Sequence, residues 1–343
     1  MVAPAALVAG CQGENLTPSE RALFRDLNPL GFILFARNCV SPDQIRALIA
    51  ELRDTVGRVD APVLIDQEGG RVQRLKPPHW RNAPAAAVFA DLARTNPAAA
   101  HEGARINARL IADELSDLGI TVDCLPVLDL PQPGADPIIG DRAAGDTPER
   151  AIALGRATFD GLMAGGVLPV IKHIPGHGRA AVDSHLGLPV VHATASELTA
   201  HDFAPFTALQ DAPWAMTAHV VYSAFDPDRA ATISRRVVSQ VIRGIIGFDG
   251  VLISDDIGMG ALGGPMVQRA ADALDAGCDV VLHCSGKLDE MQALAAARVR
   301  PLDRLALKRL ARADAALERA KAPWDAAEGR ARLSRLLGDR SGL

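Results

Sequence analysis

The chain of 343 residues is 48% hydrophobic and 22% charged, so it can bury a sizeable core and does not have the composition of a disordered protein. Its formal net charge is −5, from 36 basic and 41 acidic residues, and it contains no basic block. We therefore expect no nucleic-acid partner and no binding to an anionic membrane surface. No apolar run approaches the ~20 residues that a membrane-spanning helix needs.

Five cysteines are scattered along the chain, mainly in or beside apolar segments. An odd and scattered set is typical of reduced thiols, so we expect a cytoplasmic protein. One alternative would place the protein on a membrane, because Leu7-Val8-Ala9-Gly10-Cys11 resembles a lipoprotein cleavage site. No Lys or Arg precedes this segment, and only ten residues are available for a signal, so we interpret it as a first strand.

Short apolar segments recur along the chain and predict eight β-strands. In chain order these are Ala6–Gly10, Gly31–Ala36, Pro62–Asp66, Ile120–Leu125, Val167–Lys172, Trp214–His219, Val251–Asp255 and Asp279–His283.

Helices with readable starts lie between these strands. A capping residue followed by proline marks four of the starts, at Thr17-Pro18, Ser41-Pro42, Asn96-Pro97 and Thr147-Pro148. The helix after Pro97 has apolar residues at the spacing of one buried face, namely Ile106, Leu110, Ile111, Leu115 and Leu118.

Eight strands that alternate with helices predict an α/β fold, a single (β/α)₈ TIM-like barrel. A doubly wound open sheet is the competing architecture, but no Gly-x-Gly-x-x-Gly turn follows the first strand. No linker or composition shift divides the chain, so we expect one domain over residues 1–343. The Ala/Arg-rich sequence from about residue 301 to 343 predicts a C-terminal helical extension packed on the barrel. We expect a monomer.

Polar and titratable residues follow the predicted strands, at the end where the active site of such a barrel lies. They are Asp66-Gln67-Glu68-Gly69-Gly70-Arg71, Asp129, Lys172-His173, His219, Asp255-Asp256 and His283. Each alone would be weak evidence, because a buried histidine that is hydrogen-bonded in a core is commoner than a catalytic one. Unpaired polar groups are costly inside a protein, so their coincidence at one end of the barrel indicates an active site.

Two kinds of chemistry fit these residues. A metal could be bound by His173, His177, His185 and Asp183, although Pro175 prevents a helix that would bring the first two histidines onto one face. The other possibility, which we favour, is acid/base and nucleophilic catalysis with Asp255 and a histidine as partners. Carboxylates, arginines and a lysine at the rim suit a neutral, hydroxyl-rich ligand such as a sugar.

The chain resembles the bacterial β-N-acetylglucosaminidases of glycoside hydrolase family 3, in their cytoplasmic, peptidoglycan-recycling branch. The motifs that carry the resemblance are Gly31-Phe32-Ile33-Leu34-Phe35-Ala36-Arg37-Asn38, Asp66-Gln67-Glu68-Gly69-Gly70-Arg71-Val72-Gln73-Arg74, Ile138-Ile139-Gly140-Asp141-Arg142, Lys172-His173-Ile174-Pro175-Gly176-His177-Gly178, Asp183-Ser184-His185, Gly247-Phe248-Asp249-Gly250 and Ser254-Asp255-Asp256. A set of this length in this order is highly specific.

The resemblance implies a retaining β-N-acetylhexosaminidase that removes terminal β-linked N-acetylglucosamine, with muropeptide fragments as the expected substrate. It implies that Asp255 is the nucleophile and that His185, with Asp183 beside it, is the acid/base. A histidine side chain titrates near ~6.5, so it can donate a proton to a leaving oxygen and later accept one from water. Enzymes of this family need no cofactor, and we expect none, nor a metal.

The resemblance also implies which residues hold the terminal sugar: Asp66, Arg74, Arg142, Lys172 and His173. A carboxylate accepts hydroxyl protons, and arginine and lysine donate to hydroxyl and acetamido oxygens.

Neighbouring residues match the same motifs without an assigned chemical step. We interpret Glu68 as shaping its loop, and Asp256 as supporting structure because adjacent residues of a strand point to opposite faces. His177 is expected to order the glycine-rich loop around it.

The chain departs from the family pattern on the leaving-group side. It has Ile174 where phenylalanine is common, Asp256-Ile257-Gly258-Met259 where leucine and serine are usual, and Ala144 in place of an aromatic residue. Two other functions therefore stay open. A β-N-acetylglucosaminide phosphorylase is compatible with a histidine acid/base, which does not repel phosphate. A non-catalytic barrel that binds cell-wall sugars would show no turnover.

Overall fold

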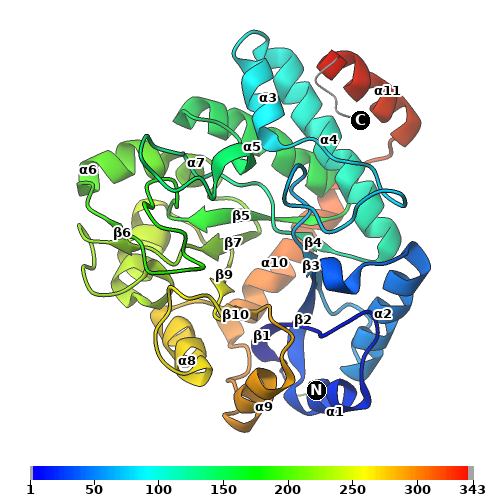
Figure 1. Ribbon diagram of the computed structural model, residues 1–343, viewed down its shortest axis with the longest axis vertical. Helices are drawn as coiled ribbons and strands as arrows, with labels where there is room; N and C mark the ends of the chain where they lie inside the picture. Colours follow the sequence, from blue (N-terminus) through cyan, green and yellow to red (C-terminus); the bar gives the residue numbers. More distant parts are fainter. Residues whose placement is uncertain (1–2, 339–343) are drawn as a thin grey trace.

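The computed structural model describes residues 3–338, in which eight parallel strands close into a barrel (Figure 1). Around the barrel the order is β1, β2, β3, β4, β5, β7, β9 and β10, and β10 pairs again with β1. Their bounds are β1 (Ala5–Gly10), β2 (Pro29–Leu34), β3 (Val63–Ile65), β4 (Val122–Asp123), β5 (Leu168–Ile174), β7 (Trp214–Thr217), β9 (Val251–Asp256) and β10 (Val280–His283). The predicted (β/α)₈ fold is confirmed, and each of the eight predicted segments contributes one barrel strand.

Six of the eight strands end one or two residues away from their predicted ends, and β4, β5 and β7 bear most on the site. β4 is short because the Leu125 amide turns back to the Asp123 carbonyl (2.8 Å) and the following Pro126 has no N–H to continue the ladder. β5 continues to Ile174, past the predicted end. β7 ends at Thr217, so His219 lies beyond the strand rather than at its last position.

The helices before the tail are α1 (Pro18–Leu27), α2 (Pro42–Thr55), α3 (Ala86–Ala93), α4 (Pro97–Leu118), α5 (Pro148–Ala164), α6 (Ala195–Glu197), α7 (Ala204–Ala208), α8 (Met266–Ala276) and α9 (Leu288–Ala296). Short 3₁₀ segments cover Ala36–Asn38, Gly140–Arg142 and Ala231–Ile233, and π-helical segments cover Leu198–Asp202 and Val237–Ile245. The second π-helical segment stands between β7 and β9, where regular alternation predicts an α-helix.

The four predicted helix starts are confirmed. Thr17 closes a capping box, in which its hydroxyl accepts from the Glu20 amide (3.2 Å) and the Glu20 carboxylate accepts from the Thr17 amide (2.9 Å). Ser41, Asn96 and Thr147 cap α2, α4 and α5, and in each case the side-chain oxygen accepts one hydrogen bond from a backbone amide of the helix. Because side-chain caps satisfy amides that a helix cannot, each fixes where its helix begins. The predicted apolar face of α4 is buried along its length.

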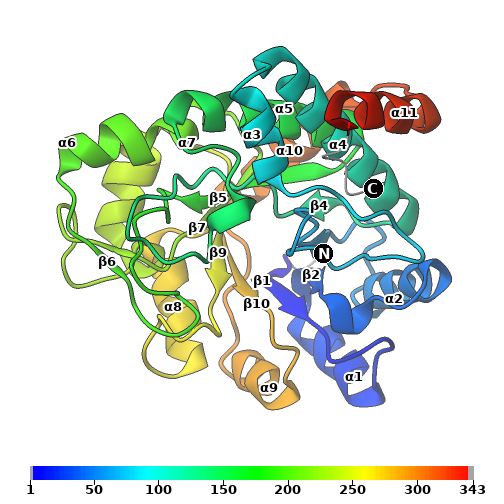
Figure 2. The same cartoon turned by 45° about the horizontal axis from the view of Figure 1, so that its top comes forward.

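The C-terminal extension forms two helices, α10 (Arg304–Ala320) and α11 (Ala326–Leu337). In Figure 1, α10 passes behind the strands, where Leu310 and Leu317 face the N-terminal end of the barrel. Figure 2 shows α11 beside α4, against which Leu333 and Leu337 are buried. Residues 339–343 of the predicted tail lie outside the described part of the chain.

A small two-stranded sheet lies outside the barrel and anchors a long loop. β6 (Val190–Val191) pairs in parallel with β8 (Val221–Tyr222), and the segment between β5 and β6 (residues 175–189, the β5–β6 loop) runs between barrel and sheet. All five cysteines are free. Among the described residues, we find no helix with the length and apolar character that crossing a bilayer requires.

Candidate active site

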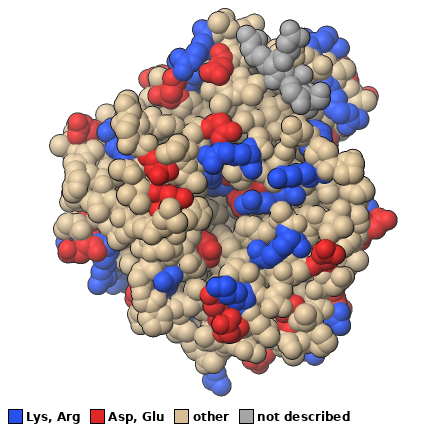
Figure 3. Space-filling view, in the orientation of Figure 1, with Lys and Arg blue, Asp and Glu red and all other residues tan. Residues whose placement is uncertain are grey.

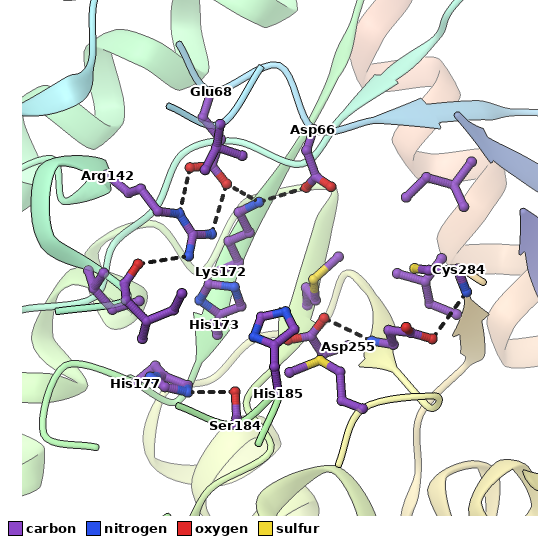
Figure 4. Close-up of a pocket in the computed structure, with 18 of the residues that line it drawn as sticks. Asp66, Glu68, Arg142, Lys172, His173, His177, Ser184, His185, Asp255 and Cys284 are labelled. Carbon is purple, nitrogen blue, oxygen red and sulfur yellow. Dashed lines mark hydrogen bonds and ion pairs between the residues drawn. The ribbon is translucent and has the colours of Figure 1, made fainter. Parts of the chain in front are cut away.

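A buried network of opposite charges lines one side of a cavity at the C-terminal end of the barrel (Figure 4). Lys172, whose side chain is 2% exposed, donates to Asp66 (2.9 Å) and lies 2.5 Å from Glu68. Arg142 forms two parallel hydrogen bonds to Glu68, at 2.8 and 2.9 Å, and Arg74 donates to Asp66 at 3.0 Å. Every charge in this network has a partner, which is the condition for burying it.

The pairing keeps both carboxylates ionised. Burial alone would raise the pKa of Asp66 and Glu68, but the Lys172 ammonium with Arg74 and Arg142 holds both pKa values below their ordinary range. The same carboxylates raise the pKa of Lys172 against the opposing effect of burial. Both oxygens of Glu68 are occupied by cations, which is the arrangement of a residue that positions others rather than of a general acid.

Asp255 is the next-to-last residue of β9 and faces the same cavity. Burial would raise the pKa of its carboxyl, but His173, His219, the Asp256 amide (2.8 Å) and Lys172 lower it overall, so it is ionised at neutral pH. Asp256 also reaches the cavity, but its carboxylate accepts from the backbone amides of Gly258 (2.9 Å) and Cys284 (3.1 Å). Each carboxylate thus keeps one oxygen without a backbone bond, but burial raises the pKa of Asp256 whereas the pKa of Asp255 is lowered, so Asp255 is the more readily ionised of the two.

Two histidines of the Lys172–Gly178 motif are oriented by one buried carboxylate, that of Asp129. Its oxygens contact His173 Nδ1 (2.6 Å) and accept from the His177 amide (2.6 Å). Burial would raise the pKa of Asp129, but His173 and His177 lower it to about 2. The sequence placed Asp129 only as a polar residue beyond a strand, whereas the structure makes it the group that fixes this motif.

Replacing Asp129 with asparagine is expected to change how the free energy of unfolding depends on pH in the acid range. A depressed folded-state pKa contributes stability above the unfolded value of ~3.9, and this contribution of about 2 kcal/mol is lost as the pH falls toward 2. The difference in unfolding free energy between the wild type and Asp129→Asn should therefore narrow between pH 5 and 2 in urea titrations. Asp43→Asn, at a 97% exposed side chain, is the control. Parallel profiles for the wild type and Asp129→Asn would contradict the assignment.

Asp183 and His185 form a second oriented pair, on the β5–β6 loop. Asp183 accepts from the His185 amide (2.9 Å) and contacts its Nδ1 (2.7 Å), which leaves Nε2 directed elsewhere. Burial opposes the ionisation of Asp183, but its bonds to His185 together lower its pKa. The His185 ring is 59% exposed and lines the cavity, whereas Asp183 is not among the lining residues. An ionised aspartate that holds one imidazole nitrogen favours a charged ring during proton transfer.

These groups meet in one cavity of about 220 Å³, which opens in the hollow at the centre of Figure 3. The cavity brings together most of the predicted site residues, namely Asp66, Arg74, Arg142, Lys172, His173, His185 and Asp255. Figure 4 shows the His185 ring entering from the loop side, toward Asp255, with the charged network opposite. The geometry therefore offers an ionised carboxylate, an oriented imidazole and a charged wall able to bond hydroxyl groups.

Several lining residues were not predicted from the sequence. Phe35 lies under the Arg74 guanidinium, 5.1 Å from ring centre to carbon, and holds it in place. Met216, Met259 and Cys284 add an apolar lining near Asp255. Phe35 and Met259 stood in segments that the sequence singled out without giving these two residues a role, and nothing in the sequence pointed to Met216.

His219 and His283 are the two other histidines predicted at strand ends. His219 bonds Thr232 (2.7 Å) and the Asp256 carbonyl (2.9 Å), and His283 contacts Glu290 (2.9 Å). Both are fully buried and neither lines the cavity. Within residues 3–338, no three His, Cys, Asp or Glu side chains gather in a way that could hold a metal ion. His173 and His185 each have Nδ1 against a carboxylate, which is an arrangement that orients an imidazole for acid/base or hydrogen-bonding roles.

Comparisons with known proteins agree with this geometry. The family model described as Glycosyl hydrolase family 3 N terminal domain matches residues 9–319. A β-hexosaminidase of Alkalilimnicola ehrlichii is 41% identical over 283 residues, 81% of this chain and 80% of that protein, and one of Methylococcus capsulatus is 39% identical over 277 residues, 80% of each. The crystal structure of NagZ from Neisseria gonorrhoeae with N-trifluoroacetyl-D-glucosamine matches with a TM-score of 0.87 at 32% identity, covering 98% of this chain and 99% of that one.

Proposed function

This chain belongs to glycoside hydrolase family 3, and we propose that it removes terminal β-linked N-acetylglucosamine with retention of configuration. The observation that carries the proposal is the single sugar-sized cavity in which the Asp255 carboxylate and the Asp183-oriented His185 ring both open. The β-hexosaminidase relatives and the sugar analogue bound by the NagZ structure support this choice of substrate.

The proposed reaction has two steps. Asp255 attacks the anomeric carbon while His185 Nε2 protonates the leaving oxygen, giving a covalent glycosyl-enzyme. The ring, now neutral, takes a proton from a water that attacks the same carbon, so the sugar leaves with its original configuration and Asp255 is regenerated. Asp183 stabilises the imidazolium before the first transfer and after the second.

The charged network is proposed to hold the terminal sugar. Asp66 is ionised and can accept hydroxyl protons, and Lys172, Arg74 and Arg142 can donate to hydroxyl and acetamido oxygens. His173, whose Nδ1 faces Asp129, is oriented to present Nε2 to the same sugar. A wall built of paired charges needs no rearrangement when a sugar binds, which favours a fixed orientation of the anomeric carbon.

The natural substrate and location follow the branch that the chain resembles. We propose that it acts in the cytoplasm on N-acetylglucosamine-containing anhydro-muropeptides during cell-wall recycling. The five free cysteines support a reducing compartment. Arg71, which lines the cavity and is 44% exposed, suits an aglycone that carries carboxylates.

Turnover of a phenyl β-N-acetylglucosaminide in phosphate-free buffer is the test. We expect release of phenol, followed by its ultraviolet absorbance, with the β-anomer of the sugar as first product by NMR, and much slower turnover of the matching β-glucoside. Release that begins only when inorganic phosphate is added would establish a phosphorylase. No release under either condition, with sugar binding intact, would instead establish a binding barrel.

A further inference from the structure

The segment that carries His185 is joined to the rest of the barrel by one buried side chain. Ser184 is 4% exposed, whereas the His185 side chain beside it is 59% exposed and Leu186 is 82% exposed. The Ser184 hydroxyl lies 3.0 Å from His177 Nε2, and His177 is itself fixed to Asp129 through its backbone amide. The loop tip is thus tied to the motif at the end of β5 (Figure 4).

Two backbone hydrogen bonds tie the same residues to the segment that follows Asp255. The Ala261 amide donates to the Ser184 carbonyl (3.1 Å) and the Gly260 amide donates to the His185 carbonyl (3.2 Å). In the described part of the chain, these bonds and the Ser184–His177 bond are the hydrogen bonds that connect residues 183–187 to the remainder of the protein. The contact is close, because a Cβ on Gly260 would lie 2.6 Å from the His185 carbonyl oxygen.

His177 has the properties of a fixed, neutral partner. It is 4% exposed, and burial lowers its pKa to about 4, so its ring is uncharged at neutral pH. Among residues 3–338, its Nδ1 has no hydrogen-bond partner, and Ser184 is the only group that its ring bonds. A hydroxyl both donates and accepts, so either tautomer of His177 can bond it.

We propose that Ser184 and Gly260 are positioning residues that set where His185 lies relative to Asp255. Ser184 acts through its bond to His177, and Gly260 acts through its lack of a side chain. This inference rests on the proposed function, because it assumes that His185 transfers the proton. Ser184 of one motif and His177 of the other thus act together to hold the segment that carries His185, which neither motif shows alone. Misplacement of a reacting group by about 1 Å is sufficient to slow a reaction substantially.

Ser184→Ala is expected to slow hydrolysis only of those substrates whose leaving group needs a proton. For a phenyl β-N-acetylglucosaminide, we expect kcat/KM to fall about 3- to 10-fold, the loss of one hydrogen bond. For the dinitrophenyl glycoside, whose leaving group departs without a proton, kcat/KM should change less than about twofold. Ser184→Thr retains the hydroxyl and should restore the phenyl glycoside rate. An equal loss on both substrates would show that Ser184 acts on sugar binding or folding, and would overturn the inference.

Gly260→Ala tests the other side of the contact, with Gly263→Ala as its matched control. The first places a methyl group against the His185 carbonyl, and the second meets nothing within 4 Å. We expect Gly260→Ala to reproduce the leaving-group dependence of Ser184→Ala, and Gly263→Ala to behave as wild type. Identical kinetics for the two glycine variants would overturn the role assigned to Gly260.

Hydrogen exchange separates this inference from the proposed function. In Ser184→Ala, the amides of Gly260 and Ala261 should exchange faster than in the wild type, without a change in thermal midpoint. An inactive wild type would overturn the proposed function and the catalytic half of this inference. An active wild type whose Ser184→Ala variant matches it in exchange and in both rates would overturn the positioning role alone.

Discussion

Replacing Asp255 with asparagine is expected to reduce kcat on a phenyl β-N-acetylglucosaminide by about 10⁴-fold or more, because an amide cannot form the covalent intermediate. The variant should still bind N-acetylglucosamine, since Asp66, Lys172 and Arg142 form their network without contacting Asp255. Steady-state rates give the first quantity, and calorimetric titration with N-acetylglucosamine gives the second.

Asp256→Asn is the matched control for Asp255→Asn. The Asp256 carboxylate accepts from two backbone amides, and an asparagine oxygen can keep part of that bonding. We expect a fall in kcat of about tenfold or less. If the two variants lost activity equally, or if Asp256→Asn were the less active, the nucleophile would not be Asp255.

Replacing Lys172 with methionine is expected to lower the unfolding free energy by about 3–5 kcal/mol. The variant removes the cation that Asp66 and Glu68 share, so each buried carboxylate keeps one arginine but no positive charge lies between the two. Removing one partner of a buried ion pair is strongly destabilising. Urea denaturation followed by circular dichroism measures the change. Activity should fall with stability, because the sugar would lose an ordered donor and the two carboxylates would repel each other.

The pH dependence of the Lys172→Met effect has a definite sign. Asp66 and Glu68 have depressed pKa values, so their contribution to stability is present above the unfolded values near ~4 and is lost as the pH falls. The destabilisation should therefore shrink below about pH 4, where the carboxyls of the variant are neutral. Arg71→Met breaks a half-exposed pair with Asp141 and should cost about 1 kcal/mol or less. A loss of similar size in both variants would contradict the special role of the buried network.

Sequence patterns were sufficient for the architecture because they report local physics. Each apolar segment gave one barrel strand, since strands buried on both faces are continuously apolar. Each capping residue with its proline gave one helix start, since the cap is made within four residues of the chain. The clustering of polar residues at strand ends likewise predicted which end holds the cavity.

Strand ends depended on local turns that the apolar pattern does not show. β4 stops early because Leu125 bonds back to Asp123, although the apolar sequence continues. The π-helical segment before β9 shows the same limit, because its apolar pattern resembles that of an ordinary helix.

By itself, then, the sequence determined the barrel, its helix starts and most of the candidate residues that line the cavity. Only the tertiary structure decided which of them pair: that Glu68 is held by both Lys172 and Arg142, that Asp129 orders two histidines, and that Ser184 meets His177. The physical reason is that strand and cap signals depend on neighbours along the chain. The partners of the buried charges come from different strands and loops, which barrel closure brings within hydrogen-bonding distance, and Ser184 reaches His177 only through the fold of the β5–β6 loop.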